Sequence, residues 1–180
     1  HAGAVGLGHA LEHRHLVARV VLEDRVELPR LSLAWHTPAM FHDDDAAMDI
    51  AADVLSNGKT SRLYRALVYD TCLAADVSAL QASREMSSVF HVSATAAPGQ
   101  SLEAIAAVID RTLDDLATSG PTTDELERAT ARAEAQFVYR VQTIGGFGGK
   151  SDQLNAYNVF TGTPGFIHAD RERYARATAD

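Results

Sequence analysis

Cysteine is nearly absent from this 180-residue sequence, and its single copy, Cys72, cannot form a disulfide within the chain. Lysine occurs only at Lys59 and Lys150, and 24 acidic residues stand against 16 basic ones. The net charge of -8 and the lack of a basic cluster exclude a phosphate-backbone footprint, so we expect no nucleic-acid partner. The sequence also lacks an apolar run near the roughly 18 residues that span a membrane.

The remaining composition is typical of a globular domain. Only 5 prolines and 12 glycines occur, and 46% of the residues are hydrophobic, which excludes a collagen-like or disordered chain. A chain of this length buries about two thirds of its unfolded surface, so folding requires no structural metal. Cys72 lies in an apolar stretch, where we expect a buried structural thiol.

Hydrophobic periodicity predicts clustered strands followed by helices. The predicted strands are 18–23, 30–37, 73–83 and 86–96, and the last two are expected to form an antiparallel hairpin. The predicted helices are 43–57, 61–70, 101–119, 122–141, 151–160 and 166–178. Because the strands do not alternate singly with helices, the order indicates an α+β fold with an antiparallel sheet covered by helices.

The helix predicted from Asp43 shows how the faces are assigned. Apolar residues such as Ile50 repeat on one side, while Asp45, Asp49 and Asp53 share the other, so we expect the three carboxylates to face solvent. Asn57-Gly58 is typical of a left-handed end to this helix. Thr60 or Ser61 would cap the next helix, and Thr122 or Thr123 with Glu125 would form a capping signature.

Two tripeptides resemble the end of a phosphate-binding loop, but neither has the required context. Gly58-Lys59-Thr60 and Gly149-Lys150-Ser151 would each need a glycine five positions earlier, where the sequence has Asp53 and Ile144. No G-x-S-x-G nucleophile motif occurs either. The sequence therefore favours neither nucleotide binding nor serine-nucleophile chemistry.

The segment His9-Ala10-Leu11-Glu12-His13 matches H-x-x-E-H, which places two imidazoles one helical turn apart for Zn²⁺. The intervening Glu12 would then act as a general base on a zinc-bound water. A third ligand has to come from another element. The nearest candidate, Glu85, falls in a predicted hairpin turn, so an active zinc site remains only an alternative hypothesis.

A longer pattern carries a family resemblance. Its pieces are W-x-T-P-A at 35–39, L-x-x-G-x-x-S-R-L-Y with Leu67-Val68 over 55–68, and L-A-x-x-V at 73–77, followed by the later helices in the same order. This pattern resembles the second, non-catalytic half of bacterial M16 zinc metallopeptidases. The resemblance covers about residues 16–180, leaves 1–15 as an irregular N-terminal segment, and suggests a domain truncated at its C-terminal end. It implies an α+β half-domain with helices packed on one face of the sheet.

The resemblance implies that the chain is a substrate-enclosing half without catalytic residues or a cofactor of its own. Zinc would belong to a homologous partner half, and the two halves would enclose a peptide or an unfolded segment. The implied substrate groove contains Trp35, His36, Arg84 and His91. In the family the zinc motif belongs to the first half, which disfavours a zinc site at His9, Glu12 and His13.

Two alternatives stay open beside this reading. The chain could be a proteolytically silent structural partner subunit, or an autonomous zinc peptidase that uses the N-terminal H-x-x-E-H. An uncovered strand edge and uncovered apolar surface would also favour self-association into a homo-oligomer.

Overall fold

Three antiparallel strands form the sheet of this computed structural model, which describes residues 18–177. The strands are β1 (Arg30–Thr37), β2 (Ala74–Ala82) and β3 (Ser88–Ala96), in the spatial order β1-β3-β2. The predicted hairpin of β2 and β3 is confirmed, because both strands alternate apolar and polar residues across a short turn.

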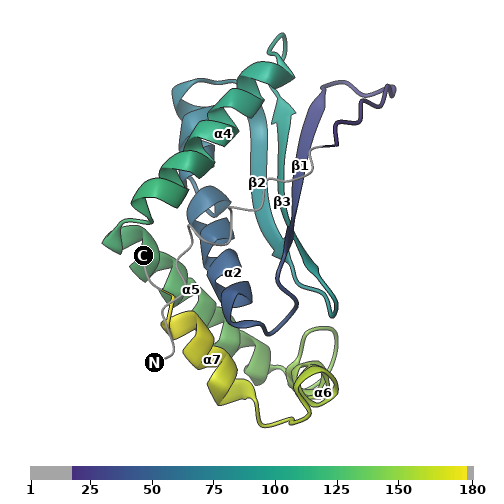
Figure 1. Ribbon diagram of the computed structural model, residues 1–180, viewed down its shortest axis with the longest axis vertical. Coiled ribbons are helices and arrows are strands. Elements are labelled where there is room, and N and C mark those ends of the chain that lie inside the picture. Colours follow the sequence, from purple (N-terminus) through teal and green to yellow (C-terminus); the bar gives the residue numbers. More distant parts are fainter. Residues whose placement is uncertain (1–17, 178–180) are drawn as a thin grey trace.

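Helices follow the predicted positions closely. They are α2 (Asp43–Ser56), α3 (Arg62–Tyr64) with the π-helical turn η1 (Arg65–Asp70), α4 (Leu102–Ser119), α5 (Thr123–Gln142), α6 (Lys150–Thr161) and α7 (Ile167–Ala175). Figure 1 shows α2, α4, α5 and α7 on one side of the sheet. The predicted α+β class, with helices packed on one face of an antiparallel sheet, is confirmed. Within residues 18–177, none of the helices has the length and apolar character needed to cross a membrane.

The core lies between this helical layer and the middle strand. Along β3, Phe90, Val92, Ala94 and Ala96 are fully buried, while the residues between them are half-exposed. Ile50 of α2, Leu63 of α3 and Ile109 of α4 reach the same core. The predicted apolar face of α2, with Ile50, therefore lies in the core.

Local capping signals also explain where the helices begin. Thr122 caps α5, since its hydroxyl accepts from the Glu125 N–H and the Glu125 carboxylate accepts from the Thr122 N–H. Ser61 precedes α3, and Gly58 adopts the left-handed φ of 88° that the sequence predicted. Of the neighbouring candidates, Thr122 caps α5, and Ser61 takes the N-cap position of α3 without a capping hydrogen bond from its side chain.

The strand predicted at 18–23 is wrong. This segment has no regular structure, and Val20, Val21 and Leu22 are 74–87% exposed. A strand forms only where a neighbour completes its hydrogen-bond ladder, and within residues 18–177 the sheet contains just β1, β2 and β3. The alternation of apolar and polar residues alone was therefore insufficient to predict a strand in this segment.

Two burial expectations are also wrong. Cys72 is exposed, and it lies with a positive φ of 52° in the junction between η1 and β2. Asp45 is only 4% exposed, and Asp49 and Asp53 are half-buried, although all three were expected to face solvent. Helix α7 and the end of β2 cover this side of α2, a packing that the periodicity of α2 cannot reveal.

Candidate functional site

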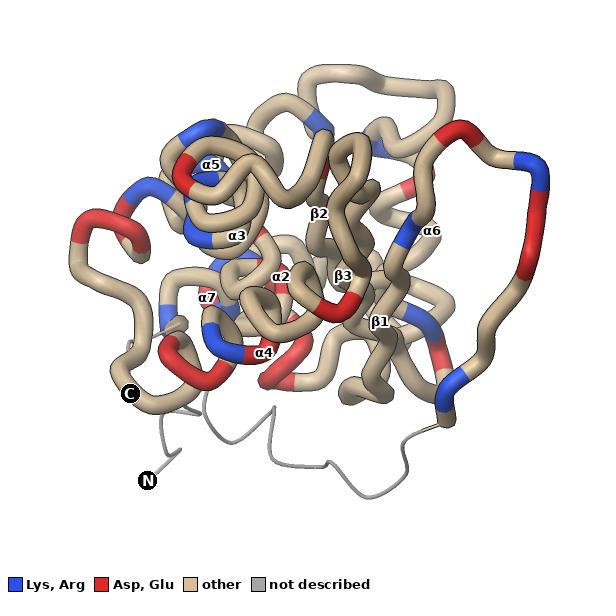
Figure 2. The backbone as a smooth tube through the Cα atoms, turned by 90° about the horizontal axis from the view of Figure 1, so that it is seen from above, with Lys and Arg blue, Asp and Glu red and all other residues tan. Residues whose placement is uncertain are grey.

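The face of the sheet that turns away from the helices carries mostly polar and small residues, together with the exposed Leu80. The strand register places Ala34, His91 and Leu80 in one row across it, and Ser32, Ser93 and Ser78 in the next. Ser78 and Ser93 hydrogen-bond through their hydroxyls at 3.1 Å. In Figure 2 the strands are nearly free of charge, whereas charged residues gather on the helices and on the segment 18–29.

Two of the four predicted groove residues share this open face. His36 pairs with Val89 and His91 lies two residues further along β3, so the two imidazoles are diagonal neighbours on adjacent strands. The ring of His36 lies 3.5 Å from the Ser87 hydroxyl. The open face therefore presents two histidines that can donate or accept hydrogen bonds.

The other two predicted residues lie elsewhere. Trp35 points to the helix-covered face, half-buried, with its ring 6.3 Å from that of Phe90. Arg84 is exposed in the β2–β3 turn, where its carbonyl accepts from the Met40 N–H at 2.8 Å. Arg84 thus stands at the end of the sheet near His36, and Trp35 supports β1 from behind.

A separate groove runs between α2, α5 and the outer edge of β2. Its volume is about 350 Å³. The walls combine polar and charged residues with small and large apolar ones. They are Asp49, Ile50, Ala52, Asp53, Ser56 and Asn57 from α2 and its end, Ala79 to Gln81 from β2, Ala129, Arg132, Ala133, Gln136, Phe137 and Arg140 from α5, and Tyr174 from α7. Sequence reasoning missed this site, although the small residues Ala129 and Ala133 one turn apart on α5 were a visible signal.

Carboxylates one turn apart on α2 have different partners in this groove. Asp53 pairs with Arg132 at 3.0 Å, which ties α2 to α5. Asp49 accepts a hydrogen bond from the Tyr174 hydroxyl at 2.5 Å. Burial raises the pKa of Asp49 to about 6 against the lowering effect of this bond, and the pKa of Tyr174 is raised by burial and by the neighbouring carboxylate.

The outer edge of β2 is blocked at one point by a side chain. The Ser56 hydroxyl accepts from the Ala79 N–H at 2.8 Å and donates to the Ala79 carbonyl at 3.1 Å. A serine hydroxyl can do both at once, so it occupies the position of a pairing strand. The outer edge of β1 has no such cap within residues 18–177.

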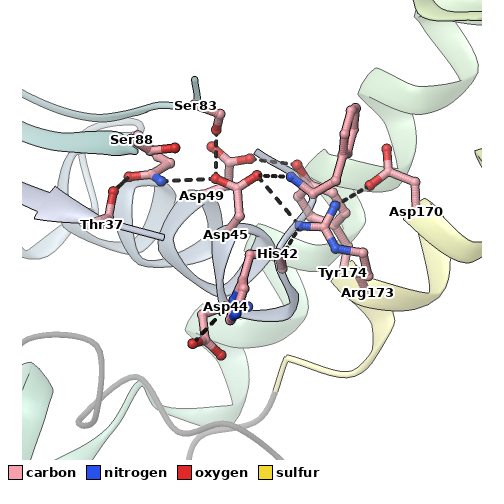
Figure 3. A network of polar contacts seen from close by, with 12 residues as sticks. Thr37, His42, Asp44, Asp45, Asp49, Ser83, Ser88, Asp170, Arg173 and Tyr174 are labelled. Carbon is pink, nitrogen blue, oxygen red and sulfur yellow. Dashed lines mark hydrogen bonds and ion pairs between the residues drawn. The ribbon is translucent and has the colours of Figure 1, made fainter. Parts of the chain in front are cut away.

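A buried ionic cluster holds α7 against the start of α2 (Figure 3). The Arg173 guanidinium lies 2.6 Å from the Asp170 carboxylate and 3.5 Å from that of Asp45, and it donates to the His42 carbonyl. Tyr157 of α6 donates to Asp170 at 2.7 Å. Because Asp45 and Asp170 neutralise Arg173, the cluster is suited to hold the helices together, although the buried Arg173 Nε has no hydrogen-bond partner within residues 18–177.

Asp45 extends the cluster to the end of the sheet. It accepts from the Gln81 side chain at 2.9 Å, from the Ser83 hydroxyl at 2.7 Å and from the Phe41 N–H at 3.1 Å. Gln81 in turn accepts from the Thr37 hydroxyl. The carboxylate thereby links α2 to the ends of β1 and β2 and fixes Phe41, whose φ is 65°.

Metal-binding geometry is not found in the described part of the chain. Within residues 18–177, no group of three or more His, Cys, Asp or Glu side chains could hold a metal ion. His9, Glu12 and His13 lie outside these residues. The predicted boundary between the segments 1–15 and 16–180 lies outside them as well.

The three-stranded antiparallel sheet with a helical layer on one side defines an α+β domain. The model of the peptidase M16 inactive domain matches residues 9–132. The chain therefore belongs to the peptidase M16 family, in its inactive domain. This result confirms the resemblance that the sequence pattern indicated.

Relatives support the same assignment. The zinc protease PqqE of Helicobacter pylori is 29% identical over 124 residues, which cover 69% of this chain and 28% of that protein. A solved protease structure from Helicobacter pylori superposes with a TM-score of 0.73 and 25% identity, over 87% of this chain and 37% of that one. The solved structure of an inactive peptidase domain from Bordetella parapertussis superposes with a TM-score of 0.71 and 24% identity, over 89% of this chain and 85% of that one. The chain thus spans well under half the length of the two Helicobacter relatives.

Proposed function

We propose that this chain is the substrate-enclosing, non-catalytic half of an M16-type zinc endopeptidase. A homologous half would carry the zinc, and the two together would surround a peptide or an unfolded segment. The observation that supports this proposal best is the helix-free sheet face of a domain that belongs to the inactive M16 type. A sheet covered on one side only can form the wall of a chamber.

The open face provides the wall that a peptide would touch. His36 and His91 supply hydrogen-bonding groups among the small residues Ser32, Ala34 and Ser93, so an extended chain can approach closely. Arg84 stands at the end of this wall as an exposed cation. Trp35 contributes from the covered face by supporting β1 against Phe90.

Reconstitution tests the proposal. The chain is mixed with a zinc-bearing M16 half from the same genome, and cleavage of an internally quenched peptide is measured for each half and for the mixture. We expect cleavage in the mixture only. Equal cleavage by the zinc-bearing half alone would contradict the proposal.

A charge variant tests the wall itself. His36→Glu combined with His91→Glu places two carboxylates on the open face, and for acidic peptides we expect KM to rise about fivefold, equivalent to about 1 kcal/mol. His168→Glu, an exposed histidine on α7, is the matched control and should leave KM unchanged. If His168→Glu raised KM as much as the double variant, the open face would not be the wall of the proposed chamber.

The two alternatives give different results in the same experiments. A stable complex without any gain in cleavage would favour a silent structural subunit. An autonomous zinc peptidase would hold about one zinc per chain, lost in a His13→Ala variant. We expect the purified chain to contain no stoichiometric zinc by elemental analysis.

A further inference from the structure

Asn57 and Gly58 lie at the end of α2, and together they form a chemically labile pair. An asparagine side chain loses its amide when the backbone nitrogen of the next residue attacks it, and a following glycine has no Cβ to hinder the attack. The sequence contains three asparagines, at 57, 155 and 158, and only Asn57 precedes a glycine. Both residues of the pair are exposed, and the Gly58 N–H makes no hydrogen bond within residues 18–177. The reacting groups are therefore accessible.

The reaction at this pair consumes only water. The Gly58 nitrogen gives up its proton and bonds to the side-chain carbon Cγ of Asn57, and the amide nitrogen of Asn57 leaves with that proton as ammonia. The resulting five-membered succinimide ring takes up one water at either of its carbonyls, which yields aspartate or isoaspartate at position 57. Overall the chain exchanges one ammonia for one water.

The fold holds the pair away from the reactive geometry. Ring closure requires the Gly58 nitrogen to lie on the same side of the Asn57 Cα–C bond as Cβ, whereas the ψ of 105° at Asn57 turns it away. Arg132 of α5 fixes this backbone, because its guanidinium donates to the Asn57 carbonyl at 3.0 Å. Asp53 accepts from the side-chain amide of Asn57 and pairs with the same guanidinium at 3.0 Å. Two charge-assisted bonds thus restrain both rotations that the attack needs.

We propose that Asn57 is a deamidation site, and that Arg132 keeps it unreactive as long as α5 packs against α2. Arg132 is a positioning residue, which acts through the Asn57 carbonyl and through Asp53. When this contact opens locally, the Asn57 backbone can turn into the ring-closing geometry. The extent of modification then reports how often the contact between α2 and α5 has opened. The inference does not depend on the proposed function.

The modified chain cannot restore the same contact. A carboxylate at position 57 replaces the amide that donates to Asp53, so two like charges then lie beside one guanidinium. Isoaspartate also inserts one extra backbone carbon where Arg132 binds the carbonyl. Because Asp53, Asn57 and Arg132 all line the groove between α2, α5 and β2, the groove becomes more acidic. Deamidation is thus an irreversible change in this contact and in the charge of the groove.

Ageing of the purified chain tests the site. The chain is kept at mildly alkaline pH, either folded or unfolded in urea, and its peptides are analysed by mass spectrometry for a gain of one mass unit. An isoaspartyl methyltransferase with S-adenosylmethionine labels the isoaspartate product. In urea we expect the gain at Asn57, while Asn155 and Asn158 of α6 are internal controls that react far more slowly. Folding should slow the reaction at Asn57 about tenfold or more. Equal rates at Asn57 in the two states, or equal rates at the three asparagines in urea, would overturn the inference.

Variants of Arg132 test its protective role in the folded chain. Arg132→Ala frees the Asn57 carbonyl and the Asp53 carboxylate, so deamidation should become about tenfold faster. Arg132→Lys keeps the cation and should retain part of the protection. Arg128→Ala, at an exposed arginine one turn earlier on α5, is the matched control and should leave the rate unchanged. In urea all these chains should react alike. A folded Arg132→Ala chain that reacts no faster than the wild type would overturn the inference.

Two further variants keep the test decisive where Arg132→Ala fails to fold. Asp53→Asn keeps the shape of the side chain but removes the charge that holds Arg132, so deamidation at Asn57 should become about threefold faster. An unchanged rate in this variant would reject the protection. Gly58→Ala has the opposite sign, because its Cβ shields the attacking nitrogen, and it is measured in urea, where the positive φ of 88° no longer matters. Modification as fast as in the wild type would exclude attack by this nitrogen.

Discussion

The two outer edges of the sheet are built differently. The edge of β2 is flanked by α2 and α5, capped at Ala79 by Ser56 and bordered by charged residues. The edge of β1 directs the backbone groups of Ser32, Ala34 and His36 outward, and no strand within residues 18–177 pairs with them. An exposed edge is a template for pairing with another chain, and proteins usually cover such edges. Within residues 18–177 the difference leaves β1 as the edge without a side-chain cap, and therefore as the edge better suited to pairing with another chain.

The structural support of the two edges differs as well. Behind β2 stand the core residues of α2 and the ionic cluster of Arg173, Asp45 and Asp170. Behind β1 the side chains of Leu31, Leu33 and Trp35 remain half-buried. Substitutions on the β2 side should therefore affect folding most, and substitutions at β1 should affect association.

The largest effect is expected in the core under β2. Ile50 of α2 is 1% exposed, and Ile50→Asp would bury an unpaired carboxylate at a cost of more than about 4 kcal/mol, leaving mostly insoluble protein. Ala34→Asp at the exposed β1 edge is the control and should stay folded. Solubility and circular dichroism measure both. Comparable solubility of the two variants would show that substitutions on the β2 side affect folding no more than substitutions at β1.

The ionic cluster gives the next effect. Arg173→Ala leaves Asp45 and Asp170 buried without their cation, and we expect the free energy of unfolding in urea to fall by about 3–5 kcal/mol. Arg171→Ala breaks only the exposed pair with Glu134, so its effect should stay within about 0.5 kcal/mol. Similar losses in the two variants would show that the cluster contributes no more than a surface pair.

The local part of this architecture was predictable from the sequence. The β2–β3 hairpin and the caps at Ser101 and Thr122 depend on neighbours a few residues away. The alternation along β1 also places Trp35 and His36 on opposite faces, as the period of a strand requires. Such features follow from backbone geometry and local hydrogen bonds, which a short window of sequence contains.

The groove and the cluster were not predictable in this way. Asp45 meets Gln81 and Ser83 across 36 and 38 residues, and Arg173 meets the His42 carbonyl across 131. Periodicity assigned Asp45 and Asp49 to solvent because it reports one helix and not what packs against it. The same limitation explains why the strand predicted at 18–23 is wrong. The alternating pattern of this segment suits a strand, but no strand within residues 18–177 pairs with it.

Association should depend on the bare β1 edge. Ala34→Pro removes an outward N–H without breaking the ladder to β3, and we expect self-association to weaken about tenfold in sedimentation velocity. Trp35→Pro is the contrasting variant, because Trp35 is bonded inward to Phe90 and its loss costs about 3 kcal/mol of stability. Unchanged self-association in a folded Ala34→Pro variant would exclude β1 as the contact.

The smallest effect concerns the groove beside β2 and its dependence on pH. Burial raises the pKa of Asp49 from 3.8 to about 6, so between these values the folded chain binds more protons than the unfolded chain. Ionising Asp49 therefore costs stability as pH rises through this window. Glu125 acts in the opposite sense, because its bond with Arg62 lowers its pKa to about 2 and its contribution is lost as pH falls from 4.5.

Asp49→Asn separates these two contributions. The variant removes the loss of stability between about pH 4 and pH 6, so its free energy of unfolding should exceed that of the wild type by about 1 kcal/mol at pH 7 and by less at pH 4. Urea unfolding at the two pH values measures this difference. Asp76→Asn at the exposed start of β2 is the matched control and should shift both values equally. A variant that loses stability at pH 7 would mean that the hydrogen bond from Tyr174 fully compensates the burial of the Asp49 carboxylate.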